Sequence, residues 1–595
     1  MPYEEQIRTR LCVIGGGMAG ICAAVAAARR GLSVVLISDR PVLGGNASSE
    51  VRMWIRGAAN LFPAYREGGI VEEIAMRNTR FNPEMNYAQW DGVLYGIVTA
   101  EKNLRLILNA TCLGASVSGN RITEVECWQL TTYKRIKVYA DYFADCSGDS
   151  ILAEFTGAQI MKGREGHRLG EKSAVEGPDE KTMGNSCLIQ ARETDRPVAF
   201  TPPPFTAKLT SEQFRYRMDT ANPLSYRDDN FWWIELGGER DTLRDAEEIQ
   251  RELIAIAYGV WDYIKNSGKF DSANWELDWV GYLPAKRESR RYRGDVVLTE
   301  NDITGGTAFP DEVAYGGWPM DDHNPLGFAS AAPPNRNIIP PAPYPIPYRS
   351  LYSVNIANLW FAGRNISVSH IALSSTRVMA TCAATGQAVG TACAIAAAYS
   401  ADARGVNAHI GELKQALRDD DCYLLNTPRR LSDSIAGART DLEGGIGVWL
   451  NGLERDVGSD QAVTLNKGQP LTFTFDRTYA GRIRLLFDND IARSYCGGYV
   501  MKMFPQRCNV PLGAERAAFS PSLVKSYTLE VLTGNGWRSI FSENDNWLRL
   551  KYVDVGYEIS GIRFTGTKTY GADKIRLLSV DITEKPVAIG EPREG

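Results

Sequence analysis

Three glycines near the N-terminus constrain the fold of this chain more than any other feature of its sequence. Gly15, Gly17 and Gly20 lie in LCVIGGGMAGICAAVAAARRGLSVVLIS, between an apolar run and an alanine-rich segment. In the pattern G-x-G-x-x-G the first glycine permits a tight turn, the second lets a pyrophosphate approach the backbone, and the third lets helix and strand pack closely. The helix N-terminus directs a positive dipole at the phosphates. We therefore expect a strand–turn–helix–strand unit that binds a dinucleotide, with Met18 and Ala19 also in contact.

The sequence offers more than one partner for the ribose. The second strand ends in VVLISDRPVLGG, about 20 residues beyond the glycines, where such a unit normally carries an acid. Ser38 occupies the usual position and Asp39 follows it. A shift of one residue turns a side chain to the other face of a strand, so Asp39 can serve only if the strand ends at Ile37 or Ser38. Arg40 is compatible with a 2′-phosphate, an adenine ring or solvent, and the sequence leaves these open.

Composition excludes several classes of function. The chain has 595 residues, enough for two or three domains, and its 66 basic and 71 acidic side chains leave a net charge of −5. No basic stripe is interleaved with aromatic residues, so no nucleic-acid partner is expected. The N-terminus has no signal region and the apolar run 21–28 is too short to span a bilayer, so we expect a cytoplasmic protein without a membrane partner. Eleven cysteines form no CxxC pair, which predicts no metal site and buried thiols at Cys12 and Cys22.

Two further segments narrow the choice of cofactor. RPVLGGNASSEVRMW combines Gly44 and Gly45, which permit close backbone approach, with the hydrogen-bonding side chains of Asn46 and Ser48. Far downstream, NLWFAGRNISVSHIALSSTRVMATCAATGQAVGTACAIAAA predicts a strand over 359–362, a polar loop and a long helix rich in alanine and glycine. A simple NAD dehydrogenase has nothing of this kind at the equivalent place.

These segments resemble FAD-dependent oxidoreductases of the glutathione-reductase-like fold, over roughly residues 8–425. The resemblance also rests on YADYFADCSGDSILAEFTGA, RESRRYRGDVVLTENDI, GGWPMDDHN and IPYRSLY. More closely, the chain looks like a bacterial group encoded beside carbohydrate-degrading enzymes and related to fumarate reductase and succinate dehydrogenase flavoproteins. The resemblance implies FAD as the cofactor. Its implied contacts are Gly15, Gly17 and Gly20 at the pyrophosphate, Ser38, Asp39 and Arg40 at the adenosine, Gly44, Gly45, Asn46 and Ser48 toward the flavin, Gly148 and Asp149 beside the cofactor, and Gly363, Arg364 and Arg377 around the last helix.

The expected fold class is α/β, with a Rossmann-like FAD-binding domain split over residues 1–165 and 340–426. A substrate or cap domain is inserted over 166–339, and its aromatic segments suit either sugar stacking or an ordinary core. The proline-rich segment 333–349 is expected to cross the surface. Alternating patterns such as LTFTFDR and SYTLEVLTG predict a β-sandwich over 430–590 that looks galactose-binding-like. A structural or homo-oligomer-forming sandwich is equally compatible with these patterns.

The chemistry of carbinol oxidation needs a base for the hydroxyl proton, and the chain has only four histidines. His370 is the first candidate, because it lies in the loop between the expected strand and the last helix. A loop histidine that only bonds a carbonyl is the alternative. His323 is the second candidate, with Asp321 and Asp322 available to orient it, and a proline-built turn is its alternative.

A run of five cations in KRESRRYRGD has two interpretations. Such runs usually form a solvated face, but guanidinium groups also bind carboxylates bidentately. Arg287 and Arg290 are the candidates for substrate binding, with Arg364 and Arg377 as further possibilities.

Together these features predict an FAD-dependent oxidoreductase that dehydrogenates a hydroxyl of a sugar, sugar acid or glycoside by hydride transfer to flavin N5. Its partner is then a small-molecule carbohydrate. Two alternatives stay open: a flavin-fold carbohydrate-binding protein without redox turnover, and a reductase of an unsaturated carboxylic acid.

Overall fold

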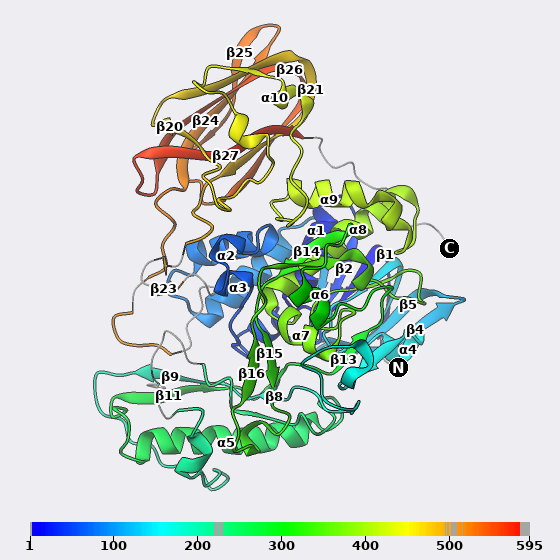
Figure 1. Ribbon diagram of the computed structural model, residues 1–595, viewed down its shortest axis with the longest axis vertical. Coiled ribbons are helices and arrows are strands. Elements are labelled where there is room, and N and C mark those ends of the chain that lie inside the picture. Colours follow the sequence, from blue (N-terminus) through cyan, green and yellow to red (C-terminus); the bar gives the residue numbers. More distant parts are fainter. Residues whose placement is uncertain are drawn as a thin grey trace.

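A seven-stranded sheet forms the centre of the large domain in the computed structural model (Figure 1). The structure describes residues 3–218, 224, 230–493, 495–496, 499–500, 509–514 and 516–583. The strands of this sheet are β1 (Tyr3–Ile14), β2 (Val34–Ile37), β3 (Leu104–Ile107), β4 (Ala110–Ser118), β5 (Arg121–Gln129), β6 (Lys134–Asp145) and β18 (Leu359–Phe361). Their order is β3-β2-β1-β6-β5-β4, and β18 pairs with the end of β6.

The predicted strand–helix–strand unit is present. It consists of β1, α1 (Met18–Arg29) and β2, which runs parallel to β1. All four residues of β2 are buried, as an apolar strand inside a parallel sheet requires. Cys12 and Cys22 are buried in β1 and α1, as expected. β6 also runs parallel to β1, whereas β5 pairs antiparallel with both β6 and β4.

Helix α8 (Met379–Tyr399) packs closely on α1. A Cβ atom built on Gly386 would lie 2.1 Å from the carbonyl oxygen of Ala19, so only glycine permits this approach. Within the described part of the chain, α8 is the one helix that is long and apolar enough to cross a membrane. In its most apolar stretch of 18 residues, 83% is buried inside the protein, as in the core helix of a domain.

Residues between β6 and β18 form the inserted region, part of which lies at the lower side of Figure 1. Its elements are β7 (Ile160–Lys162), β8 (Asn185–Ser186), β9 (Ile189–Glu193), β10 (Glu235–Leu236), α5 (Ala246–Asn266), β11 (Trp275–Val280), β12 (Ala285–Lys286) and β13 (Arg290–Tyr292). Its core buries one side of α5, including Ile249 and Trp261. α6 (Glu300–Gly305), β14 (Glu312–Gly316), β15 (Met320–His323), β16 (Asn335–Ile338), β17 (Tyr344–Pro347) and α7 (His370–Thr376) follow.

The expectation for the proline-rich segment is wrong in part. β16 pairs with β15, and β17 pairs with β14 and is fully buried. Each pair has only two strands, so each proline can sit where no ladder hydrogen bond is needed from its nitrogen. The segment therefore reaches the interior instead of only crossing the surface.

A separate antiparallel sheet lies at the C-terminal end, at the top of Figure 1. Its strands are β19 (Arg439–Thr440), β20 (Val463–Asn466), β21 (Pro470–Phe487), β24 (Val524–Thr533), β25 (Gly536–Glu543), β26 (Leu550–Thr569) and β27 (Lys574–Thr583). Alternate residues such as Leu471, Phe473 and Phe564 form its own apolar core.

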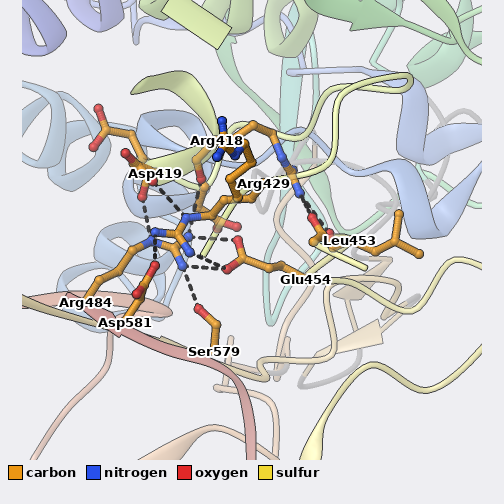
Figure 2. A network of polar contacts seen from close by, with 12 residues as sticks. Arg418, Asp419, Arg429, Leu453, Glu454, Arg484, Ser579 and Asp581 are labelled. Carbon is orange, nitrogen blue, oxygen red and sulfur yellow. Dashed lines mark hydrogen bonds and ion pairs between the residues drawn. The ribbon is translucent and has the colours of Figure 1, made fainter. Parts of the chain in front are cut away.

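Buried ion pairs join this C-terminal sheet to the large domain (Figure 2). Arg484 of β21 donates to the carbonyl oxygen of Asp419 at 2.7 Å and pairs with Glu454 at 2.7 Å, and Asp581 of β27 pairs with Arg429 at 2.7 Å. Arg429 also contacts Asp419, the last residue of α9 (Ile410–Asp419), at 2.8 Å. Charges this deeply buried are tolerated only when they are paired, so the two parts are held in one arrangement.

Candidate active site

A cavity of about 970 Å³ lies between the large domain and the inserted region. Its volume is at the upper end of the ~300–1,000 Å³ found for small-molecule and cofactor sites. The described residues that line it come from the turn after β1, the end of β2, the loop at 44–46, the residues after β6, the segment 283–290, strands β15 and β16, and residues 363–364 and 377–379.

The glycine turn forms one wall of this cavity. Gly15, Gly17, Met18 and Ala19 line it, and Gly17 is the N-cap of α1. A Cβ atom on Gly17 would meet no atom within 4 Å, so this backbone faces open space. Gly20 does not line the cavity, because it faces the turn that follows β1: a Cβ atom there would lie 1.8 Å from the Gly15 carbonyl oxygen. The turn thus leaves room for a ligand on one side and packs tightly on the other.

The loop after β2 completes this wall. Gly44 donates its backbone N–H to the Gly16 carbonyl at 2.8 Å, and Gly44, Gly45 and Asn46 all line the cavity. Ser48 is buried behind them and does not line it. The structure therefore brings three of these four predicted contacts to the cavity.

Strand β2 ends at the position that is required if Asp39 is to contact a ribose. The strand ends at Ile37 and the chain turns, so Ser38, Asp39 and Arg40 all line the cavity. Ser38 is buried against Gly16, whereas Asp39 is exposed and pairs with Arg40 at 3.6 Å.

A charged clamp follows the end of β6. Arg364 donates to the Gly148 carbonyl at 2.8 Å and pairs with Asp149 at 2.7 Å, and Lys286 pairs with Asp149 at 3.0 Å. Burial alone would raise the pKa of the Asp149 carboxyl, but the charges of Arg364 and Lys286 outweigh it and hold that pKa well below its usual range. Gly363 lines the cavity beside Arg364. The clamp joins residues that lie more than 200 positions apart.

A second set of polar side chains surrounds His323, in another part of the cavity lining. His323 Nδ1 lies 2.6 Å from Glu235 Oε2, and its Nε2 lies 3.1 Å from Asp321 Oδ2. Arg377 pairs with Asp321 at 3.3 Å, and the Trp232 ring lies 5.2 Å from the imidazole. Of the two aspartates expected to orient His323, Asp321 does so and Asp322 turns away. We call His323, Asp321, Arg377 and Trp232 the His323 cluster.

The cationic run 286–295 is not a solvated face along its first part. Arg287 is 4% exposed, and it pairs with Glu235 at 3.3 Å. Arg290 is 9% exposed, pairs with Glu154 and donates to the Asp149 carbonyl at 2.9 Å. Both line the cavity, so the interpretation as a solvated face is wrong for these two residues.

His370 lies elsewhere, which corrects the order of the two histidine candidates. It is 2% exposed, does not line the cavity, and its ring contacts Glu288 at 2.9 Å and Asp322 at 3.1 Å. Burial alone would lower the pKa of His370, but these two carboxylates raise it to about 10. His323 lines the cavity and His370 does not, so His323 is the better placed of the two to reach a substrate.

Several lining residues were not predicted. Lys286, Trp318 and Asn335 line the cavity, and Glu235 lies directly behind His323. Lys286 stood in the cationic run and Glu235 in the aromatic segment FWWIELGG, but nothing in either pattern distinguishes these residues from their neighbours. Within the described ranges, no group of three or more His, Cys, Asp or Glu side chains could hold a metal ion.

Comparison with known families decides the class of the protein. The sequence model of a family described as "FAD dependent oxidoreductase" matches residues 11–417. The chain belongs to this FAD-dependent oxidoreductase family. It is therefore an FAD-dependent oxidoreductase, and FAD is its cofactor. No curated protein matches the chain.

Several solved structures are similar to parts of the chain. L-proline dehydrogenase from P. horikoshii is 21% identical with a TM-score of 0.16, over 25% of this chain and 24% of that one. A single-residue mutant of E. coli quinol fumarate reductase FrdA is 13% identical with a TM-score of 0.29, over 70% and 75%. The family 32 carbohydrate-binding module of Streptococcus pneumoniae EndoD is 15% identical with a TM-score of 0.19, over 26% and 99%. Similarities this low carry no argument about substrate.

The cavity suits FAD on physical grounds. Gly17 leaves open space at the positive end of α1, where the pyrophosphate of such cofactors binds. Nine cationic side chains and five carboxylates are among the described residues of the lining, so its charge balance favours an anionic ligand.

Proposed function

We propose that this FAD-dependent oxidoreductase removes a hydride from a carbinol carbon of a sugar, sugar acid or glycoside. Bound FAD would supply the two-electron acceptor for that hydride. The observation that carries the proposal is the His323 cluster, in which an imidazole, a carboxylate, a guanidinium and an indole share one wall of the cavity. Aromatic faces stack on sugar rings, and the polar groups can bond hydroxyls.

The pair formed by His323 and Asp321 is the proposed acceptor of the hydroxyl proton. General base catalysis requires a group within hydrogen-bonding reach of that proton, and both residues line the cavity. Burial alone would raise the pKa of Asp321, but His323 and Arg377 outweigh it and hold that pKa well below its usual range. Asp321 therefore stays ionised beside His323.

Unsatisfied polar atoms support a polar substrate. Among the described residues of the lining, Arg377 Nε, Trp54 Nε1, Trp318 Nε1 and Asn230 Oδ1 are buried and have no hydrogen-bond partner within the protein. Buried polar groups are normally paired, so a ligand or ordered water is expected to complete them. Several donors and one acceptor around an aromatic wall match a molecule that carries several hydroxyl groups.

Reduction of an unsaturated carboxylic acid is the second candidate. Arg287 and Arg377 favour it, because guanidinium groups bind carboxylates bidentately. Both are already paired with protein carboxylates, at 3.3 Å each, which supports the first candidate over the second.

A dye-coupled assay separates the two reactions. The purified protein is tested with neutral sugars, glycosides and sugar acids in the presence of an artificial electron acceptor, and with unsaturated acids in the presence of a reduced dye. Turnover with a sugar, sugar acid or glycoside is expected. Turnover only in the second assay would replace the proposal with the reductase.

We further infer that the C-terminal sheet bends into a galactose-binding-like sandwich with a structural role. Strands β21 and β26 are 18 and 20 residues long and their pairing is interrupted by register shifts, which is how a strand bends between two layers. The contact of Arg484 with Asp419, and the pairs of Arg429 with Asp419 and Asp581, support a fixed position on the large domain.

A further inference from the structure

Helix α7 is attached to strand β15 at both of its ends. Its first residue, His370, bonds through Nε2 to Asp322 at 3.1 Å. Arg377, which caps its C-terminus, bonds to the side chain and the carbonyl oxygen of Asp321, at 3.3 and 3.1 Å. Two consecutive aspartates of one strand thus hold the two ends of one short helix.

The two attachments lie on opposite faces of β15. Side chains along a strand alternate between its faces, so Asp321 and His323 share one face and Asp322 occupies the other. This agrees with the lining of the cavity, which includes Asp321 and His323 but not Asp322. His370 therefore contacts β15 on the face that is turned away from the cavity.

His370 is itself fixed by the residues around it. Its Nδ1 bonds to Glu288 at 2.9 Å, and its backbone N–H donates to Glu165 at 2.9 Å. Glu288 also pairs with Arg291 at 2.9 Å, and its side chain is fully buried. A charged group bonded on three sides in the interior has little freedom to move, so it can serve as a rigid anchor for Asp322.

We propose that His370 is a positioning residue. It fixes β15 from the face that is turned away from the cavity, and so keeps the side chains of Asp321 and His323 in position at the cavity. It exchanges no proton with the substrate. The inference rests on the proposed function in one respect: that proposal gives the His323 cluster its role in the reaction. Small errors in the position of these side chains are costly: a misplacement of about 1 Å, caused by a mutation far from the chemistry, can slow a reaction by ~10²-fold.

The test observes the imidazole ring of His323 directly, by NMR of histidine-labelled protein loaded with FAD. The chain has only four histidines, so single substitutions assign each ring signal. His370→Gln removes the charged anchor and keeps a polar side chain. Arg336→Gln is the matched control, because Arg336 also pairs with Asp322, at 3.1 Å, but is more than half exposed. We expect the His323 signal to move by more than its linewidth in His370→Gln and to stay in place in Arg336→Gln, with the flavin spectrum unchanged in both.

An unmoved His323 signal in folded His370→Gln would overturn the proposal. So would an equal movement in both variants, because then any loss of a partner of Asp322 has the same effect. If His370→Gln does not fold, Asp322→Asn is judged by the same criterion at a position that is 16% exposed. Turnover is not measured, so failure of the sugar chemistry would leave this result standing.

Discussion

Gly17 and Gly20 lie three residues apart and have different surroundings. The first borders open space in the cavity, whereas the second touches the backbone of Gly15. Substituting valine at each position therefore separates cofactor binding from folding.

We expect Gly17→Val to fold but to lose FAD, because its side chain enters the space where the pyrophosphate binds. Gly20→Val should instead destabilise the protein by several kcal/mol, since overpacking alone typically costs ~1–3 kcal/mol and here the obstacle is backbone. Flavin absorbance after purification and thermal unfolding of the FAD-free proteins measure the two effects. FAD retention by Gly17→Val would show that the cofactor lies elsewhere.

His323 is the second residue whose substitution is informative. His323→Gln should keep FAD bound but slow its reduction by substrate at least ~100-fold, the usual scale for a lost general base. His409→Gln is the control, because His409 bonds to Glu412 on the surface and does not line the cavity. Stopped-flow absorbance gives the rate. Equal rates in wild type and His323→Gln would remove His323 from the mechanism.

The sequence predicts some of these residues and not others, for a physical reason. The glycine turn is local, so three glycines at fixed spacing reveal it. The position of His370 depends on Glu288 and Asp322, which are 82 and 48 residues away in the chain. No local pattern reports such contacts, which is why a histidine next to the last helix looked like a base.

At the scale of elements, the contact between α1 and α8 decides whether the last segment can join the cofactor domain. An alanine- and glycine-rich helix was predictable from its composition, but its partner was not. Likewise β18 was predictable as a strand, whereas its pairing with β6 depends on contacts more than 200 residues apart.

Gly386→Val should separate these two helices. Its side chain would meet the backbone of Ala19, so we expect a fall in melting temperature and a weakened hold on FAD. Gly411→Val in α9 is the control, because a Cβ atom there meets nothing within 4 Å. Similar melting temperatures for the two variants would contradict the close packing of α1 and α8.

At the scale of the whole molecule, length and period-two patterns predicted a separate C-terminal β domain, but not how it is attached. The attachment is the buried network of Figure 2, whose labelled residues come from four segments of the chain: 418–429, 453–454, 484 and 579–581. No sequence pattern singled out its arginines, Arg418, Arg429 and Arg484.

Acid should weaken this attachment in a defined pH range. Burial alone would raise the pKa of Glu454, but Arg484, Arg429 and Arg418 outweigh it and lower that pKa to about 2, from an ordinary value of 4.5. Because the folded-state pKa is lowered, this stabilisation is present above pH 4.5 and is lost as pH falls toward 2.

Glu454→Gln should lose ~3–5 kcal/mol at neutral pH, the usual cost of removing one partner of a buried pair. Its free energy of unfolding should also fall less steeply than that of wild type between about pH 5 and 3. Urea denaturation at several pH values measures both. Parallel pH curves would show that Glu454 carries no such shifted pKa.

The most direct test of the whole account is an anaerobic visible spectrum of the FAD-loaded protein, titrated with sugars, sugar acids and glycosides. The account predicts that one of these compounds bleaches the flavin band in a single turnover, and that His323→Gln slows the bleaching. A flavin that none of them reduces, but that reoxidises from its reduced form when an unsaturated acid is added, would contradict it.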